Sequence, residues 1–591
     1  MRHHARYARR VRSLSRPLCS AALPAQPDRR QGPRKRLGRS ARALAAAALL
    51  SVITMVEATQ APAATCESLV ALSVPDTTIT SAVSIPGPSF TAPDGRTYQE
   101  VPPFCRVTAL ATPSPDSLIN IEVWMPSSGW NGRFEGTGNG GYAGNIALDV
   151  PEMISGVKAG RTVAATDMGT APSTNNDGDV LVGHPEKWVD FGSRATHVMT
   201  VVSKLIIAAF YGQPPRYSYF NGCSTGGQQA LMEAQRFPHD YDGILGGDPA
   251  NNRTHVHTAA VWNYKAFHTT PASFFTSDKI QLVTQSVVAA CAVKSGGLAT
   301  DAFLTDPRLC DWDPGALQCP TLDGPDCLTA DQVQAARAIY DGARNPTNGH
   351  LIFPGSVKGS ENASDLGWAA QESTPEPQFD SLFKWVFGPT WLWSTFDYDR
   401  DMADVDLVLA PILNANSTDL SGFKARGGKL LMYHGWADPI VAPQDMIDYH
   451  NRVVATQGKQ AARALKETQT FFRLFMVPGM NHCSSGPGPN AFGNLYSAHI
   501  VVPPPPASDA AHDAFLALQE WVEHGVAPAR IIATKYVNDQ PSQGIQMQRP
   551  LCPFPAVPRY SGTGDTNDAA SFVCIDDHVT DNPMPAPEYL Q

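Results

Sequence analysis

The serine at position 224 gives the first indication of chemistry. Residues 221–229 read NGCSTGGQQ, which places Ser224 in a Gly-x-Ser-x-Gly pattern. A predicted strand, residues 216–222, comes before it, and a predicted helix, residues 225–238, comes after it. A nucleophile elbow has this order, because a tight strand-to-helix turn exposes the serine between small neighbours. We therefore expect Ser224 to be a nucleophile, and the alternative is a Gly/Ser turn without chemistry.

A serine nucleophile needs a base, and the base needs a carboxylate that orients it. After an elbow these two residues follow in the order acid, then histidine, each on a loop behind a strand. Asp438 lies in a GWADP segment and His482 in a PGMNHC segment, each directly after a predicted buried strand. We assign Asp438 as the orienting acid and His482 as the general base and acid. The alternatives are Asp445 and Asp448, which we expect to be solvated on the next helix, and His434, which we expect to be a structural hydrogen-bonding residue.

The oxyanion of an acyl-transfer intermediate needs two preorganised N–H donors. The backbone of Thr225, directly after the serine, is the expected first donor. The glycine-rich segment GTGNGGYAG, residues 136–144, follows an earlier predicted strand and lets backbone approach the substrate. Gly141 is the preferred second donor and Gly140 the next candidate, and the alternative is a flexible hairpin loop.

Predicted strands and helices alternate before and after a long interruption. Alternation up to about residue 250 predicts a mainly parallel sheet covered by helices, the α/β class. Between residues 251 and 421 the alternation gives way to scattered helical turns and many aromatic residues, and it resumes near residue 427. The expected domains are a leader at 1–63, the first part of the core at 64–250, an inserted lid at 251–421 and the second part of the core at 422–591.

The N-terminus has the pattern of an export signal. Residues 1–43 hold thirteen Arg and Lys but one acidic residue, and an apolar run, residues 43–56, follows them. Ala61-Pro62-Ala63 then offers a small-residue cleavage site. The run is shorter than the roughly 20 residues of a bilayer span, so an uncleaved anchor is the less favoured alternative. We expect a secreted or periplasmic protein.

The composition and net charge of the chain bear on which binding partners are expected. Hydrophobic residues make up 43% of the chain and charged residues 17%, which is typical of a globular protein. Without residues 1–63 the chain has 32 basic and 53 acidic residues, a net charge near −21. Such a surface is expected to bind neither nucleic acid nor an anionic membrane. The sequence carries no indication of an oligomeric state.

The number of cysteines is also typical of an exported protein. One of the eleven cysteines, Cys19, lies in the leader, and the ten others are an even set without the paired CxxC spacing of a zinc site. An even number in an exported chain predicts up to five disulfides. Cys223 precedes Ser224 and Cys483 follows His482, so a bond between them would tie the nucleophile turn to the base loop. A cysteine nucleophile at Cys223 is the less favoured alternative, because that residue is not at the apex of the turn.

The adjacent Cys-Ser, the aspartate and the adjacent His-Cys resemble the CS-D-HC motif of the tannase/feruloyl esterase family, which includes mono(2-hydroxyethyl) terephthalate hydrolase. GNGGYAG, NGCSTGGQQALMEAQRFPHDYDGI, DPANN, HGWADP and PGMNHC are similar to family motifs at matching positions. The resemblance implies an exported serine esterase with an α/β-hydrolase core and a lid. It implies esters of aromatic acids as substrates: gallate, ferulate and other hydroxycinnamates, or terephthalate half-esters.

The resemblance also implies cysteine pairs and a substrate pocket. The five implied bridges are Cys66–Cys105, Cys223–Cys483, Cys291–Cys310, Cys319–Cys327 and Cys552–Cys574. Because the family lid builds the pocket for the aromatic acid, Trp391, Trp393 and Phe396 are candidate pocket residues, with core packing as the alternative. Val441, shortly after Asp438, is a further candidate.

Two departures from the family pattern stand out. Family lids often bind a structural calcium through an acidic run after the first lid cysteine, but here that stretch is CAVKSGGLATDAFLTDP. Only Asp301 and Asp306 remain as weak candidate ligands, and calcium prefers six to eight oxygens, so we expect the ion to be lost or weakly bound. Asp248 stands where the family usually has a small apolar residue, either as a turn residue or as a charge near the pocket floor.

The expected reaction is a two-step ester hydrolysis that needs no catalytic cofactor. Two other functions remain open at this point: an acyltransferase that uses the same acyl-enzyme, and a non-catalytic relative that binds phenolic compounds.

Overall fold

The computed structural model describes residues 64–363, 367–494 and 502–576. The predicted leader, residues 1–63, and the last residues of the predicted second core part lie outside these ranges.

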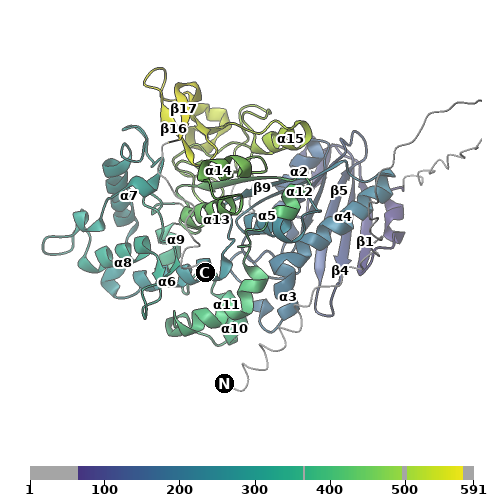
Figure 1. Ribbon diagram of the computed structural model, residues 1–591. Helices are drawn as coiled ribbons and strands as arrows, with labels where there is room; N and C mark the ends of the chain where they lie inside the picture. Colours follow the sequence, from purple (N-terminus) through teal and green to yellow (C-terminus); the bar gives the residue numbers. More distant parts are fainter. Residues whose placement is uncertain (1–63, 364–366, 495–501, 577–591) are drawn as a thin grey trace, which may run out of the picture. The chain divides into compact units, whose positions relative to one another are not determined.

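A nine-stranded sheet forms the centre of the described chain, in the order β1-β4-β5-β7-β6-β8-β9-β12-β13. The six strands from β7 to β13 are parallel, and β1, β4 and β5 continue the sheet in antiparallel pairing. Figure 1 labels β1, β4 and β5 at one end of the sheet. This arrangement confirms the α/β class that the alternating pattern predicts. The strands are β1 (Thr77–Ile85), β4 (Phe104–Ala111), β5 (Ile119–Pro126), β6 (Arg133–Thr137), β7 (Thr162–Thr166), β8 (Tyr217–Cys223), β9 (Gly243–Gly247), β12 (Lys429–Gly435) and β13 (Phe472–Val477).

Helices cover both faces of the sheet. Because successive side chains of a strand point to opposite faces, the core consists of two layers, one on each face. Along β8, Tyr219 packs with Phe515 on one face, whereas Phe220 on the other face belongs to the cluster that includes Leu231 and Met199. Strands β7 and β9 are buried along their whole length, as parallel strands covered on both faces must be. The helices of the core are α2 (Val150–Lys158), α3 (Pro185–Val189), α4 (Ala195–Tyr211), α5 (Thr225–Arg236), α12 (Ser421–Ala425), α13 (Pro443–Thr456), α14 (Ala461–Thr468) and α15 (Ala514–His524).

A long insertion separates two strands that are neighbours in the sheet. Strand β9 pairs in parallel with β12, although about 180 residues lie between them. The insertion has its own apolar cluster, to which Phe267, Val283 and Trp368 belong. Its elements are α6 (Arg253–Phe267), α7 (Ser277–Cys291), α8 (Ala330–Asp341), β10 (Ala343–Arg344), β11 (Leu351–Phe353), α9 (Trp368–Ser373), α10 (Ser381–Phe387) and α11 (Arg400–Leu413). The boundaries 251 and 421 of a separate lid domain stay a prediction.

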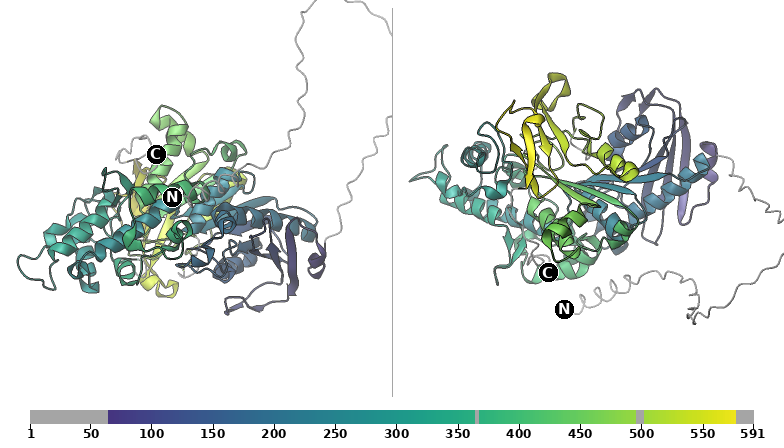
Figure 2. Two further views of the ribbon diagram at one scale, coloured as in Figure 1. Left: turned by 90° about the horizontal axis from the view of Figure 1, so that it is seen from below. Right: turned by 45° about the horizontal axis from the view of Figure 1, so that its top comes forward.

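Short antiparallel hairpins complete the described chain. The C-terminal ones lie beside the β13 edge of the sheet, where the backbone N–H of Phe554 donates to the carbonyl of Leu474 at 2.7 Å (Figure 2, right). These hairpins are β2 (Ser89–Thr91) with β3 (Thr97–Gln99), β14 (Ile531–Tyr536) with β15 (Ile545–Leu551), and β16 (Ala556–Tyr560) with β17 (Phe572–Asp576).

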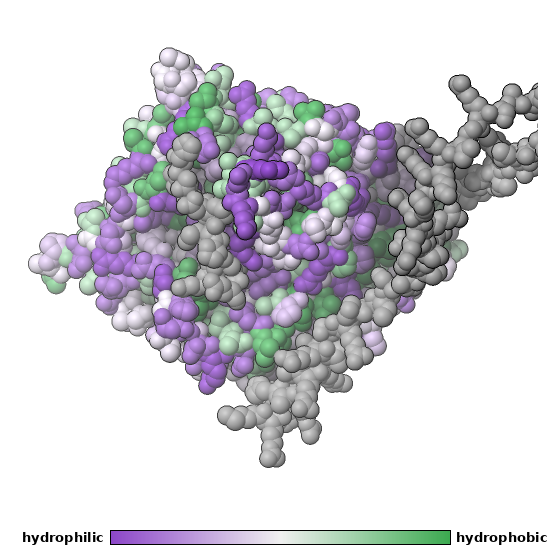
Figure 3. Space-filling model, viewed as in Figure 1, coloured by the Kyte–Doolittle hydropathy of each residue, from purple (hydrophilic) through white to green (hydrophobic). Residues whose placement is uncertain are grey.

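All five disulfides have the implied pairing: Cys66–Cys105, Cys223–Cys483, Cys291–Cys310, Cys319–Cys327 and Cys552–Cys574. On the face drawn in Figure 3, hydrophilic residues predominate and hydrophobic residues gather in scattered groups. Within the described ranges, no helix combines the length and the apolar character that crossing a membrane requires.

Candidate active site

Ser224 lies on a strained turn between β8 and α5. Its φ of 64° and ψ of −116° are backbone angles that a residue with a side chain rarely adopts, at a cost of about 1–3 kcal/mol. The turn also depends on small neighbours, since a Cβ on Gly222 would lie 2.8 Å from the Cα of Gly226. A Cβ on Gly227 would lie 2.2 Å from the carbonyl oxygen of Gly247. The sequence therefore builds the elbow geometry that the Gly-x-Ser-x-Gly pattern predicts.

His482 and Asp438 form a buried pair at the ends of β13 and β12. His482 Nδ1 lies 2.6 Å from Asp438 Oδ2, and Asp438 Oδ1 accepts the backbone N–H groups of Ile440 and Val441 at 2.9 and 3.0 Å. Burial alone would raise the pKa of Asp438, but His482 and His434 beside it hold that pKa well below its usual value. The carboxylate is therefore ionised, and it favours the tautomer in which Nδ1 carries the proton and Nε2 is unprotonated and able to act as a base.

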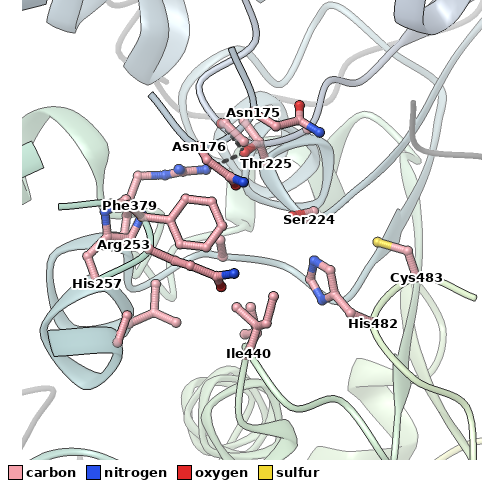
Figure 4. A pocket seen from close by; sticks show the side chains of 17 residues that line it. Asn175, Asn176, Ser224, Thr225, Arg253, His257, Phe379, Ile440, His482 and Cys483 are labelled. Carbon is pink, nitrogen blue, oxygen red and sulfur yellow. Dashed lines mark hydrogen bonds between the residues drawn. The ribbon is translucent and has the colours of Figure 1, made fainter. Parts of the chain in front are cut away.

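Ser224 and His482 line the same cavity, so the structure brings the three predicted triad residues together. Figure 4 shows the His482 ring next to Ser224. The Cys223–Cys483 bond, with a Cα–Cα distance of 5.9 Å, joins the residue before the serine to the residue after the histidine. It ties the two loops at the position where their side chains meet.

The glycine-rich loop packs directly against the elbow. The Thr225 hydroxyl donates to the carbonyl of Gly141 at 2.7 Å, and the backbone N–H of Gly226 donates to the carbonyl of Asn139 at 2.7 Å. Gly141 has a φ of 53°, and a Cβ there would lie 2.0 Å from the carbonyl oxygen of Asn175. Gly140 and Gly141 both line the cavity. These hydrogen bonds hold the loop against the elbow, and Gly140 and Gly141 as oxyanion donors stay a prediction.

A second acid and a second histidine lie beneath the pair. His434 Nε2 is 3.0 Å from the carbonyl of Val441, 3.4 Å from Asp438 Oδ2 and 3.7 Å from Asp248 Oδ1. Asp248 accepts the backbone N–H of Gly435 at 2.8 Å, and its burial raises its pKa to about 7, against the opposing effect of His434. Asp248 is thus a buried carboxyl group next to the site, and His434 has the hydrogen-bonding position expected of it.

The cavity has a volume of about 360 Å³, and its lining corrects part of the predicted pocket. Val441 lines it, as expected, but Trp391, Trp393 and Phe396 do not. These three pack inside the insertion instead. Phe383 lies 4.9 Å from the ring of Trp391 and 4.9 Å from that of Phe396.

Trp393 packs against Tyr264 at a ring distance of 5.0 Å. The side chains from the insertion and its borders that do line the cavity are Arg253, Val256, His257, Ala260, Gln378 and Phe379. Sequence reasoning missed them. For Arg253 a signal existed, because it follows the GGDPANN segment at the carboxyl end of a strand, the edge where ligands bind in such sheets.

The residues at the implied calcium position do not fit a calcium ion. Asp301 accepts Arg549 Nη2 at 3.0 Å and the backbone N–H of Leu298 at 2.8 Å. Asp306 accepts Arg308 through both carboxylate oxygens, at 2.9 and 2.6 Å. Both carboxylates are thus paired with arginine side chains. They do not provide the six to eight oxygen ligands that calcium prefers.

The parallel sheet with the Ser224 turn at the end of β8 defines the α/β-hydrolase class. Within that class, the chain belongs to the family described as tannase and feruloyl esterase, which matches residues 105–575. It is 38% identical over 550 residues to an uncharacterized esterase of Xanthomonas campestris, covering 89% of this chain and 94% of that protein. It is 35% identical over 464 residues to a probable feruloyl esterase B-2 of Aspergillus flavus, covering 76% of this chain and 83% of that protein.

Solved structures agree with this placement. Feruloyl esterase B from Aspergillus oryzae superposes with a TM-score of 0.75 at 27% identity, covering 86% of this chain and 99% of that one. A tannin acyl hydrolase from Aspergillus niger shares the fold, with a TM-score of 0.62 at 20% identity over 85% of this chain and 92% of that one. The chain is therefore a carboxylic ester hydrolase of the feruloyl esterase and tannase type.

Proposed function

We propose that this esterase is exported and hydrolyses esters of aromatic, phenolic acids, such as feruloyl or galloyl esters, through Ser224, His482 and Asp438. The observation that carries the proposal is the single cavity in which the strained Ser224 lies beside His482, with Asp438 bonded to the far side of the imidazole at 2.6 Å. The names of the relatives support the aromatic acids, and the ring of Phe379 in the cavity offers a surface for one.

The chemistry follows from the positions of these groups. As Ser224 Oγ attacks the ester carbonyl, His482 Nε2 takes the hydroxyl proton, and Asp438 stabilises the imidazolium that results. The negative charge on the former carbonyl oxygen is bound by the backbone N–H groups of Thr225 and of Gly141 or Gly140. The carbon–oxygen bond to the alcohol then breaks, and His482 returns its proton to the leaving oxygen.

The second step releases the acid. A water molecule loses a proton to His482 and attacks the acyl carbon, and the proton then returns to Ser224 as the acyl bond breaks. No step needs a metal or an organic cofactor. Export is supported by the basic and apolar leader pattern of residues 1–63 and by the five disulfides, because such bonds persist in oxidising compartments.

The test is turnover of methyl ferulate and methyl gallate by the purified chain and by Ser224→Ala. The wild type is expected to release free acid, and Ser224→Ala is expected to lose activity by at least about 10³-fold while its melting temperature remains close to that of the wild type. Ser68→Ala, which changes an exposed serine outside the site, is the matched control. Retained turnover in Ser224→Ala would refute the proposed nucleophile. Products analysed with added alcohol separate hydrolysis from acyl transfer, since transfer yields a new ester in place of the acid.

A further inference from the structure

Tyr142 lies in the glycine-rich loop of the core, but its hydroxyl group bonds to the insertion. The hydroxyl donates to the carbonyl oxygen of Phe379 at 2.7 Å and accepts the backbone N–H of Leu382 at 3.0 Å. His257 Nδ1 is farther from the same oxygen, at 3.4 Å. The side chain is fully buried, and burial raises the pKa of Tyr142 well above its usual value, so that the phenol keeps the proton that it donates. One hydroxyl thus joins two backbone groups that lie 237 and 240 residues away from it in the sequence.

The loop of Tyr142 is also fixed to the turn that carries the nucleophile. The Thr170 hydroxyl donates to the carbonyl oxygen of Tyr142 at 2.7 Å. Directly before Tyr142, the carbonyl oxygen of Gly141 accepts the Thr225 hydroxyl at 2.7 Å. Gly141 and Thr225 line the cavity together with Ser224. The Tyr142 hydroxyl is therefore held in place relative to the nucleophile.

The segment of the insertion that Tyr142 holds has a strained backbone. Phe379 has a φ of 63°, which a residue with a side chain rarely adopts and which persists only where the surroundings hold it. Its side chain lines the cavity, and in Figure 4 the Phe379 ring extends from the side of His257 toward Ser224. Leu382 is in the first turn of α10, where backbone N–H groups have no acceptor within the helix. The Tyr142 hydroxyl supplies hydrogen bonds that this segment needs to keep its conformation.

Other contacts fix the helix that follows this segment. Ser381 Oγ donates to Asp179 Oδ1 at 2.6 Å and accepts the backbone N–H of Gly178 at 3.0 Å. Trp385 Nε1 donates to the carbonyl oxygen of Gly178 at 2.9 Å. Helix α10 is therefore attached to the core independently of the Tyr142 hydroxyl, which acts on the residue that reaches the cavity.

We propose that Tyr142 is a positioning residue that sets the preference for aromatic acids, because it fixes the ring of Phe379 at the place where the acid part of the ester packs. This inference rests on the proposed function, since it uses the same cavity and the same acyl-enzyme. A flat aromatic acyl group gains binding from a ring that is held in place, whereas an acetyl group is too short to cover that ring. The hydroxyl therefore determines the selectivity between acids and takes no part in the proton transfers.

The test compares two esters that differ only in the acyl part, p-nitrophenyl ferulate and p-nitrophenyl acetate. Tyr142→Phe removes the hydroxyl and keeps the packing of the ring. Because two backbone groups lose their partner and Phe379 is no longer held, we expect kcat/KM for the ferulate ester, divided by that for the acetate ester, to fall at least about tenfold. If Tyr142 only braced the elbow, both esters would slow equally, and an unchanged ratio would refute the proposal.

Tyr449→Phe is the matched control. Tyr449 of α13 is also fully buried, donates to the carbonyl oxygen of Ser417 at 2.9 Å and accepts Gln235 Nε2 at 2.9 Å, but it does not line the cavity. It therefore loses the same kind of hydrogen bonds at another place, and we expect the ester ratio to stay within about twofold of the wild type. A fall in the ratio as large as that of Tyr142→Phe would assign the effect to a general loss of stability and overturn the proposal.

A double-mutant cycle with Phe379→Ala tests whether Tyr142 acts through Phe379. In the Phe379→Ala protein the ring is already absent, so adding Tyr142→Phe should change the ester ratio by less than about twofold. A further fall of tenfold would show that Tyr142 acts through another contact. Thr170→Val, which removes the hydrogen bond to the carbonyl of Tyr142, is a second and milder variant that should lower the ratio at least about threefold. If Tyr142→Phe does not fold, an unchanged ratio in Thr170→Val would overturn the proposal.

A binding measurement makes the result independent of turnover. Calorimetry with ferulate, the acid product, is expected to give at least about tenfold weaker binding to Tyr142→Phe than to the wild type. Equal affinities, or no binding to either protein, would overturn the role of Tyr142. Hydrolysis of both esters with an unchanged ratio in Tyr142→Phe would refute only this inference, whereas failure of the wild type to hydrolyse either ester would refute the proposed function and leave the binding result to decide the role of Tyr142.

Discussion

Removing the Cys223–Cys483 bond should affect both stability and catalysis. The double variant Cys223→Ala/Cys483→Ala opens a covalent loop of 260 residues. The chain-entropy relation gives an upper limit of about 5.6 kcal/mol for the stability that such a closure contributes. The same bond fixes the residues next to Ser224 and His482, and a displacement of about 1 Å between reacting groups can cost on the order of 100-fold in rate.

The matched control is Cys319→Ala/Cys327→Ala, which opens a loop of 8 residues whose cysteines do not line the cavity. The same relation gives about 2.5 kcal/mol for that closure. Urea unfolding and kcat for methyl ferulate are measured for both double variants. We expect the Cys223/Cys483 variant to lose more stability than the control and to lose about tenfold to 100-fold in kcat, whereas the control keeps its kcat.

A Cys223/Cys483 variant with the kcat of the wild type would refute the idea that this bond positions the serine and the histidine. A loss of stability no larger than that of the control would refute the chain-entropy reasoning.

Three further predictions address the buried acid, the implied metal and the pocket. Asp248→Asn should gain stability relative to the wild type as pH rises from about 4 to 7. Burial raises the native pKa of Asp248 to about 7, so the wild type loses stability as that acid ionises. Melting temperatures of the two proteins that differ by a constant amount across this range would contradict the prediction. Calorimetry should detect no sub-micromolar calcium binding, and Asp301→Ala should lower the melting temperature equally with calcium and with EDTA because it breaks the pair with Arg549; tight binding that Asp301→Ala abolishes would show that a site exists. Phe379→Ala should raise KM for aromatic esters about tenfold, because Phe379 lines the cavity. Trp391→Ala, outside the cavity, should leave KM unchanged and lower the stability of the protein. The reverse pattern would show that Trp391 is a pocket residue.

The parts of the site that local sequence determines could be predicted. The Ser224 turn depends on glycines within a few positions of it, and the loops of Asp438 and His482 each follow a buried strand. The residues close to each of these positions in the sequence therefore predict its local geometry. Parallel strands bring such loops to one edge of the sheet, although about 200 residues separate the serine from the acid. The cysteine pairing followed from the family resemblance, and the structure has all five bridges.

The pocket could not be predicted in the same way, because its lining depends on how the insertion packs. The aromatic run near Trp391 has the composition of a binding site, but its rings have partners inside the insertion, and Phe379 reaches the cavity instead. Asp445 shows the same limit: it was expected to be solvated on α13, but it is buried, with His255 of the insertion among its charged neighbours. Contacts between side chains from distant segments leave no pattern in the local sequence, so they could not be predicted from it.

The central claim is that Ser224 forms the acyl-enzyme, and covalent labelling tests it most directly. The full chain is treated with a fluorophosphonate, which reacts with activated serines, and the modified peptide is mapped by mass spectrometry. We predict one adduct, on Ser224, that abolishes ester hydrolysis and is absent from Ser224→Ala. An adduct on another residue that abolishes activity, or full activity in a protein labelled at Ser224, would contradict the account.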